Sequence, residues 1–383
     1  NVIYFCRGNV YAPLTSPWMQ TGTNVHLVDP ANNKVGIGTN TPLFKLSVGG
    51  DGGILAEGLY GGTSPSLGDL PGNLSRLIWY PKKAAFRAGR VIGLGIQWHD
   101  INIGYYSVAM GYETRASGRD AFAMGYQNIA SGQDASAVGG AGNNAQGIAS
   151  FIAGGSSNTS EPGAQGAFIG GGSLNHAEGI VSNISGGSFN HTYVVHSAIG
   201  GGFNNHNHGY FSFIGGGNGN QVFLESSNIG GGFDNQIGDA TSENDPVNKA
   251  AVIGGATGNR VWGITSTVGR GMQNVAGIEG TPGIGQATVA GGFNNKASGI
   301  AAAVGGGADN QATAQSSTVA GGNFNRATGI NSNVAGGLRN TASGADSTIL
   351  GGTENIVAGD TSTALGKNMI LGAAAAHTFI WGH

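Results

Sequence analysis

Three histidines stand at the same place in successive repeats of the chain: His176, His191 and His206, at steps of 15 residues. If each repeat forms one coil of a stack, their imidazoles lie about 5 Å apart in one column. Imidazole nitrogens bind zinc, copper and nickel, so the column is a candidate metal site. Gln221 and Gln236 continue the same column. We therefore favour a solvated polar column, and we predict no bound metal and no cofactor.

A second group that could hold a cation is acidic: Asp239, Glu243 and Asp245, in a repeat longer than its neighbours. Carboxylates and backbone carbonyls are the ligands that Ca²⁺ prefers, but we favour a plain polar loop. No serine, histidine and aspartate are ordered into a catalytic triad, and no two acids are placed for glycoside hydrolysis. The chain is thus predicted not to be an enzyme, and a carbohydrate-active solenoid enzyme is the weakest alternative.

The densest aromatic and basic cluster of the chain contains Trp79, Tyr80, Lys82, Lys83 and Arg87. Aromatic rings beside cationic side chains could form a binding patch. The cluster directly precedes the repeats, and the first coil of a stack needs a cover for its core. We therefore favour a junction that packs on the first coil.

The elements that must position these residues are short repeats, each closed by an asparagine. Most of these asparagines follow a glycine pair, as in Gly201-Gly202-Phe203-Asn204-Asn205. A fixed period near 15 residues indicates a solenoid whose coils each hold two short strands and two tight turns. Glycine supplies the positive φ and the close backbone approach that such turns need. The asparagines of this column are Asn175, Asn190, Asn205, Asn220, Asn235, Asn259, Asn274, Asn295, Asn310, Asn325, Asn340 and Asn355.

The asparagine column predicts a ladder inside the stack. A side-chain amide at one corner of every coil can bond the backbone of its own turn and of the adjacent coils. Such bonds satisfy groups that would otherwise be buried and unpaired. The role expected for the column is therefore structural.

Composition excludes several classes of protein. Glycine makes up 75 of 383 residues without a three-residue step, which excludes collagen. Apolar residues reach 39% and net charge is only −3, unlike a disordered chain. The basic residues form no stripe, so no nucleic-acid partner is expected. No apolar run is long enough to span a membrane.

The chain divides into three parts on this pattern. Residues 1–103 form an N-terminal β connector and junction region, and residues 104–372 form a Gly-rich repeat domain of about 17 coils. Residues 373–383 are expected to cap the last coil with an apolar plug. Extra residues within 239–249 and 278–285 must leave the stack as loops on one face.

The thin core of each coil leaves an apolar stripe outside, which a homotrimer would cover symmetrically. Cys6 is the one cysteine, so no disulfide forms within one chain. It could link chains at a trimer's N-terminus, but we favour an unpaired thiol.

The segments Tyr106-Ser107-Val108-Ala109-Met110-Gly111 and Ala116-Ser117-Gly118 resemble the head repeats of trimeric autotransporter adhesins, the YadA-like family. This resemblance covers roughly residues 104–372. It implies a left-handed parallel β-roll and a side-by-side or intertwined homotrimer. The function implied is an extracellular adhesive fibre at the cell surface, which contacts a host, matrix or cell-surface ligand. The segment from Val35 to Val48 resembles the connectors of phage tail-fibre and other surface-fibre proteins, so a phage tail-fibre receptor-binding protein is the alternative.

Overall fold

The chain forms two compact units, Asn1–Leu59 and Tyr60–His383, in the computed structural model. The structure describes residues 74–240, 250–279 and 285–382, together with residues 56–57, residues 60–61 and six short strands of the first unit. In the first unit, β1 pairs with β2 and β3 with β4 in antiparallel fashion, and β5 pairs with β6 in parallel. These strands are β1 (Tyr4–Arg7), β2 (Val10–Pro13), β3 (Trp18–Thr21), β4 (Asn24–Leu27), β5 (Val35–Ile37) and β6 (Leu46–Val48).

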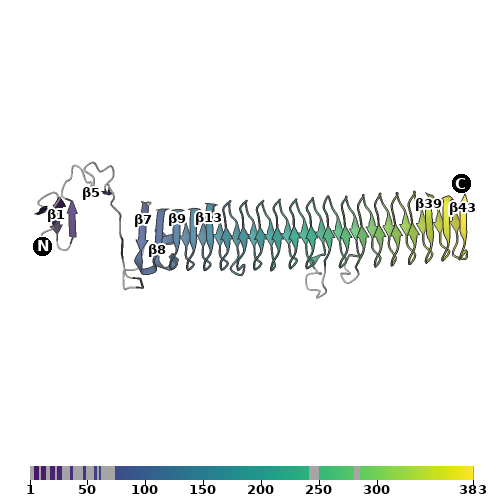
Figure 1. Cartoon of the computed structure of the whole chain (residues 1–383), viewed down its shortest axis with the longest axis horizontal. Coiled ribbons are helices and arrows are strands. Elements are labelled where there is room, and N and C mark those ends of the chain that lie inside the picture. Colours follow the sequence, from purple (N-terminus) through teal and green to yellow (C-terminus); the bar gives the residue numbers. More distant parts are fainter. Residues whose placement is uncertain are drawn as a thin grey trace. The chain divides into compact units, whose positions relative to one another are not determined.

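The second unit is a solenoid whose coils stack from β7 to β43 (Figure 1). Each coil contributes one short strand to each of two parallel sheets. Sheet 1 has 17 strands, ordered as they follow in the chain. They are β10 (Arg115–Ala116), β12 (Ile129–Ala130), β14 (Asn144–Ala145), β16 (Thr159–Ser160), β18 (His176–Ala177), β20 (His191–Thr192), β22 (His206–Asn207), β24 (Gln221–Val222), β26 (Gln236–Ile237), β28 (Arg260–Val261), β30 (Val275–Ala276), β32 (Lys296–Ala297), β34 (Gln311–Ala312), β36 (Arg326–Ala327), β38 (Thr341–Ala342), β40 (Ile356–Val357) and β42 (Ile370–Leu371).

Sheet 2 runs beside sheet 1. It begins with the β7–β8 hairpin and ends with β43, so β7 and β43 are its first and last strands in space (Figure 1). Its strands are β7 (Leu74–Tyr80), β8 (Ala85–Val91), β9 (Val108–Tyr112), β11 (Phe122–Tyr126), β13 (Ser136–Ala141), β15 (Phe151–Ile152), β17 (Phe168–Ile169), β19 (Asn183–Ile184), β21 (Ala198–Ile199), β23 (Phe213–Ile214), β25 (Asn228–Ile229), β27 (Val252–Ile253), β29 (Thr267–Val268), β31 (Thr288–Val289), β33 (Ala303–Val304), β35 (Thr318–Val319), β37 (Asn333–Val334), β39 (Thr348–Thr353), β41 (Thr363–Lys367) and β43 (Phe379–Gly382).

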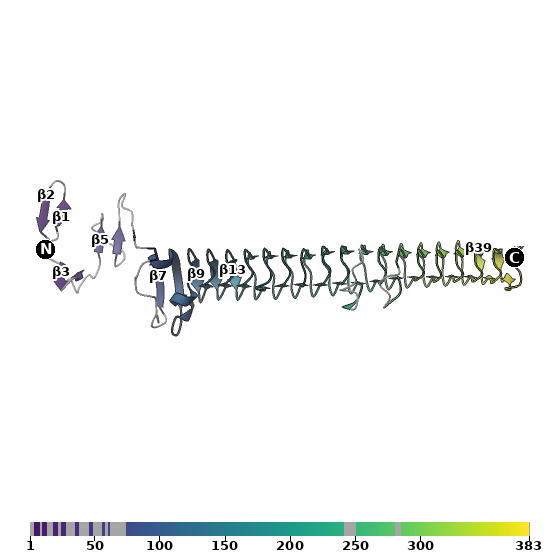
Figure 2. The same cartoon turned by 90° about the horizontal axis from the view of Figure 1, so that it is seen from below.

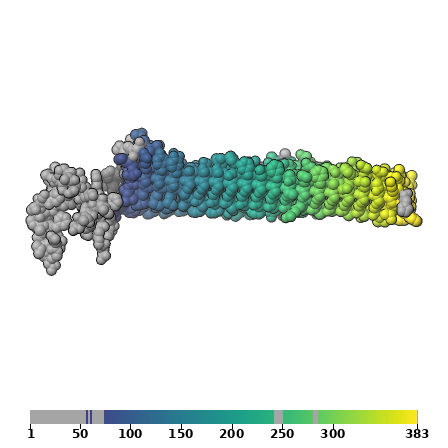
Figure 3. Space-filling view, turned by 90° about the horizontal axis from the view of Figure 1, so that it is seen from above, coloured from purple at the N-terminus to yellow at the C-terminus, as the bar shows by residue number. Residues whose placement is uncertain are grey.

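The predicted all-β parallel solenoid of about 17 coils is confirmed. A third line of single β-bridges, from Ala141 to Thr353, joins the coils beside the two sheets. Seen from two further sides, the coils remain stacked in one even column (Figures 2 and 3). No helix in the described part of the chain is long and apolar enough to cross a membrane.

The core of each coil is thin because strand alternation turns only one side chain of each short strand inward. In β18 and β19, Ala177 and Ile184 are fully buried, while His176 and Asn183 face outward. One buried turn residue, such as Ser182, and one asparagine complete the coil. The stack therefore buries small side chains, and its backbone hydrogen bonds run between coils.

Bulky residues adopt left-handed backbone at two turns of most coils. Phe189 has a φ of 57°, Val181 of 54° and Phe324 of 57°. Such a conformation costs roughly 1–2 kcal/mol for a residue with a Cβ. The stack imposes it, since the N–H of Phe189 donates to the carbonyl of Ser173 one coil earlier at 3.0 Å. Residues with a Cβ therefore share the positive-φ positions of the turns with glycine.

Further strands of sheet 2 extend the solenoid at both ends. At the start, the β7–β8 hairpin pairs with the first coil through β8 and β9. Three 3₁₀ turns follow the hairpin strands: η1 (Pro81–Lys83), η2 (Ile96–Trp98) and η3 (Asp100–Asn102). At the other end, β43 adds one more strand to sheet 2, and Ile380 packs against the core. Phe379 and Trp381 are 59% and 73% exposed, so the expected apolar plug does not include them.

Candidate functional site

The asparagine column forms a continuous buried ladder. The Nδ2 of Asn325 donates to the carbonyl of Gly321 in its own coil and to that of Gly337 in the next, both at 2.9 Å. Its Oδ1 accepts from the backbone N–H of Asn340 at 3.0 Å and from the Nδ2 of Asn340 at 3.1 Å. Asn325 has no exposed surface. Each amide thus pairs three backbone groups; of those bonded by Asn325, the carbonyl of Gly337 also accepts from the N–H of Asn323 at 2.9 Å.

The ladder starts earlier than the sequence analysis placed it. Asn128, Asn143 and Asn158 are also buried and make the same bonds. Asn128 lacks a preceding glycine pair, whereas Asn143 and Asn158 follow the pairs Gly139-Gly140 and Gly154-Gly155 and could have been found from the same phrase. The long repeats do not interrupt the ladder, since the N–H of Asn259 donates to the Oδ1 of Asn235 at 3.0 Å.

The histidine column lies on the outer surface of sheet 1. His176 and His191 stack with ring centroids 4.4 Å apart. The Nε2 of His191 lies 2.8 Å from the Oε1 of Glu178, and the Nε2 of His176 lies 2.7 Å from the Oε1 of Glu161. Their ligand atoms, together with that of Glu178, all lie within 4.8 Å of one another. Neither glutamate was expected at this site; each stands two residues beyond the histidine position of its coil.

His206 belongs to a different arrangement. Its Nδ1 lies 3.0 Å from the hydroxyl of Tyr193, and its Nε2 lies 3.1 Å from the Oδ1 of Asn204. His208 stacks on Tyr193 and on Phe223, at centroid distances of 3.7 and 4.7 Å. The predicted triplet of histidines therefore separates into a His–Glu cluster and an aromatic stack.

Burial lowers the pKa of His191 and of His208, so both are neutral at pH 7. Burial and the neighbouring His176 and His206 lower the pKa of His191 to about 3. Burial, His206 and His191 lower the pKa of His208 to about 4. A neutral imidazole has one unprotonated ring nitrogen, so each ring can accept a hydrogen bond or bind a metal ion.

The acidic candidates near the long repeat are not assembled by the described residues. Asp239 is described and half-buried, whereas Glu243 and Asp245 lie outside the described residues.

The aromatic and basic cluster is built into the N-terminal junction. Tyr80 is buried and donates its hydroxyl to Asp100, and the ammonium groups of Lys82 and Lys83 lie 3.8 and 3.4 Å from the same carboxylate. Trp79 is 45% exposed. The geometry is that of a packed junction, with one aromatic ring at its surface.

Arg87 is the most buried charge of this junction. It has no exposed surface, and burial lowers its pKa to about 10, so it stays protonated at pH 7. Its guanidinium donates to the carbonyls of Ser107 and Ala116 at 2.9 and 3.0 Å, and to the Ser107 hydroxyl. Arg87 therefore ties the hairpin to the first coils.

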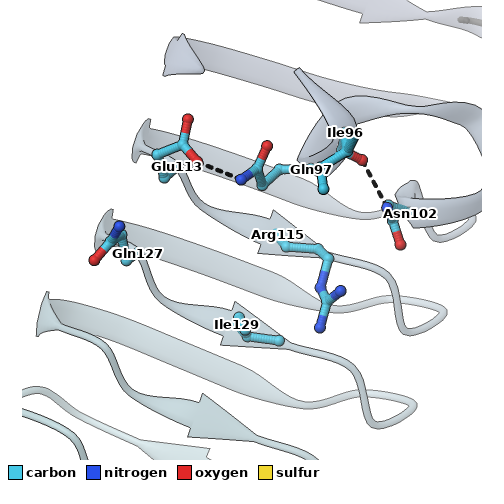
Figure 4. A pocket seen from close by; sticks show the side chains of 7 residues that line it. All are labelled: Ile96, Gln97, Asn102, Glu113, Arg115, Gln127 and Ile129. Atoms are coloured by element: carbon cyan, nitrogen blue, oxygen red, sulfur yellow. Dashed lines mark hydrogen bonds between the residues drawn. The ribbon is translucent and has the colours of Figure 1, made fainter. Parts of the chain in front are cut away.

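A cavity of about 290 Å³ opens beside the junction (Figure 4). The Glu113 carboxylate accepts hydrogen bonds from the backbone N–H of Ile92 and from Gln97, and Asn102 donates to the carbonyl of Ile96 at 2.6 Å. Glu113, Gln97 and Asn102 are thus held by hydrogen bonds to their neighbours. It is lined by Ile96, Gln97, Asn102, Glu113, Arg115, Gln127 and Ile129.

Two columns of the outer surface of sheet 2 consist of uncharged residues, one from Val108 to Phe379 and one two residues further on, from Met110 to Trp381. Charged groups lie beside these columns: Arg90 and Lys367 are exposed at strand ends, and the Arg270 side chain lies against Gly254. No Lys, Arg, Asp or Glu occurs in either column among the described residues. We call these two columns the uncharged face. Sheet 1 differs, since Arg115, Arg260, Lys296 and Arg326 stand in its outward column. For a rod in water, such an uncharged face is a candidate contact surface.

Comparison with known proteins agrees with this geometry. A family model described as the YadA head domain repeat matches the chain in two overlapping copies, at residues 103–128 and 116–141. No curated protein matches the chain. The matched residues contain β9 to β13 of sheet 2, and the same coil, with its buried asparagine, recurs after them as far as Asn355. Residues 103–141 are thus similar to YadA head repeats, and the later coils continue the same two-strand plan.

Proposed function

We propose that the chain acts as an extracellular adhesive rod in which three copies lie side by side along the uncharged face. The observation that carries the proposal is the solenoid of head-repeat type with two outward columns of uncharged residues on sheet 2. Charged side chains are depleted at the cores of protein interfaces because burying them costs free energy. A surface built for solvent would not exclude them from every coil.

Side-chain size along the uncharged face supports a close contact. Glycine and alanine fill most middle positions of the second column, such as Gly215, Gly230 and Ala320, and small residues let backbones approach closely. Larger apolar groups stand near the end, where Leu350 is 50% and Trp381 is 73% exposed. Three rods meeting here would cover both kinds of residue, whereas sheet 1 and the turns would face outward to meet a ligand.

A pair of matched substitutions tests the contact. Thr318 lies on the uncharged face and Thr341 on the outer surface of sheet 1, and both are half-buried strand residues. Thr318→Lys is expected to dissociate the trimer, because three ammonium groups would be buried together. Thr341→Lys should leave it intact, since Lys296 and Arg326 already occupy that column. Light scattering gives the mass, which is expected to be three times 38.2 kDa for the parent.

Either of two results would oppose this arrangement. A folded parent with the mass of one chain would exclude the trimer. If Thr341→Lys dissociated the assembly and Thr318→Lys did not, the copies would meet through sheet 1. Adhesion is tested separately by exposing labelled trimers to immobilised matrix proteins and to whole cells. Binding to neither would remove the adhesive role while leaving the trimer in place.

A further inference from the structure

We propose that His176, His191 and Glu178 bind one divalent transition metal ion of the zinc class per chain, with Glu161 as the fourth ligand. All four side chains project from neighbouring coils on the outer surface of sheet 1. The two imidazoles come from β18 and β20, and the glutamates follow β16 and β18. The repeat thus brings four side chains close together: two histidines from one outward column of sheet 1, and two glutamates from the position two residues further on.

The distances between these groups suit a small ion. A tetrahedral zinc ion with bonds of about 2.0–2.2 Å holds its ligand atoms about 3.3–3.5 Å apart. Here the Oε1 of Glu178 lies 2.8 Å from the Nε2 of His191 and 3.9 Å from the Nε2 of His176. The Oε1 of Glu161 lies 2.7 Å from the Nε2 of His176. The ligand atoms of His176, His191 and Glu178 all lie within 4.8 Å of one another, so these three need only small side-chain movements to converge on one ion, and Glu161 joins them by moving toward Glu178 and His191 from its place beside His176.

The cluster is open enough for an ion to enter. The side chains of His176, Glu178 and Glu161 are 34%, 39% and 36% exposed, and that of His191 is 18% exposed. They lie on sheet 1 and not on the uncharged face, so the site does not depend on how copies of the chain assemble. Each ring is also held by stacking, His176 on His191 and His191 on Tyr193. Such fixed ring orientation lowers the entropy lost when an ion binds.

The charges around the cluster are unbalanced. Residues 120–248 contain no Lys and no Arg, so no cationic side chain of this stretch can pair with Glu161 or Glu178. Elsewhere in the chain, the exposed pairs Arg260–Asp234 and Arg339–Glu354 match an acid with a base. A bound cation would neutralise the two carboxylates of the cluster. Mixed imidazole and carboxylate donors favour zinc, cobalt or nickel over magnesium and calcium, which prefer oxygen ligands alone.

Isothermal titration of the full chain with ZnCl₂ tests the site directly. One ion per chain is expected to bind the parent, and MgCl₂ should give no binding. His176→Gln and His191→Gln are each expected to weaken zinc binding at least tenfold, as is Glu178→Gln. Glutamine already occupies the histidine position at Gln221 and Gln236, so these variants should keep the fold. Thermal melts in metal-free buffer check that they do.

His206→Gln is the matched control, since it makes the same change one coil further along the same column. It should bind zinc within about twofold of the parent if the His–Glu cluster is the site. No zinc binding by the folded parent would overturn the proposal. Equal binding by parent and by the folded His176→Gln/His191→Gln double variant would also overturn it, because the ion would then bind elsewhere.

Discussion

Gly322→Ala is expected to lower the free energy of unfolding by about 2–5 kcal/mol, from overpacking and from a left-handed backbone together. Gly322 has a φ of +88°. A Cβ built there would lie 2.2 Å from the carbonyl oxygen of Gly337 and 2.6 Å from the Nδ2 of Asn325. Neither neighbour can yield, because one belongs to the backbone of the next coil and the other to the buried ladder. Denaturant unfolding of both proteins measures the difference.

The adjacent glycine provides the control. Gly321 has an ordinary φ, and a Cβ added there would meet nothing within 4 Å. Gly321→Ala should therefore be neutral or stabilise slightly, by up to about 1 kcal/mol through the unfolded chain. Equal destabilisation by the two variants would mean that the glycine pair serves flexibility and not close approach between coils.

Asn325→Ala should destabilise the chain by at least about 1–3 kcal/mol, because buried backbone groups would lose their partners. The carbonyls of Gly321 and Gly337 and the N–H of Asn340 all bond this amide. Asn325→Asp separates shape from chemistry, since a carboxylate fits the same space but cannot donate to the two carbonyls. It should destabilise at least as much as alanine. Thermal melting measures each variant.

Asn310→Ala should have a similar effect, and the two losses should not add. The N–H of Asn325 donates to the Oδ1 of Asn310 at 3.0 Å, so the two residues share a bond, and neighbouring sites couple. Lys296→Ala is the surface control and should change stability by less than about 0.5 kcal/mol. If Asn310→Ala melted with the parent while Lys296→Ala did not, the ladder would carry none of the stability of the stack.

The sequence by itself determined the coil, its period and its asparagine. The phrase Gly-Gly-x-x-Asn recurs because most coils repeat the same hydrogen-bonded turn. This local pattern is therefore enough to predict the solenoid. The same reasoning predicted strands with one inward residue each, because the side-chain period of a strand is two. It did not include Asn128, whose coil lacks the Gly-Gly-x-x-Asn phrase, or Asn143, which ends such a phrase, and it did not predict the left-handed backbone that Phe189 and Phe324 adopt.

The tertiary structure alone decided which side chains meet across coils. The spacing of the repeats predicted that His176, His191 and His206 share one column. In the structure the side chains of His176 and His191 lie beside Glu178, whereas that of His206 lies beside Tyr193. The uncharged face likewise depends on which strand residues of sheet 2 point outward. Such groupings join residues of adjacent columns and coils, which one-dimensional spacing does not encode, because they depend on rotamers and on the lateral distance between columns.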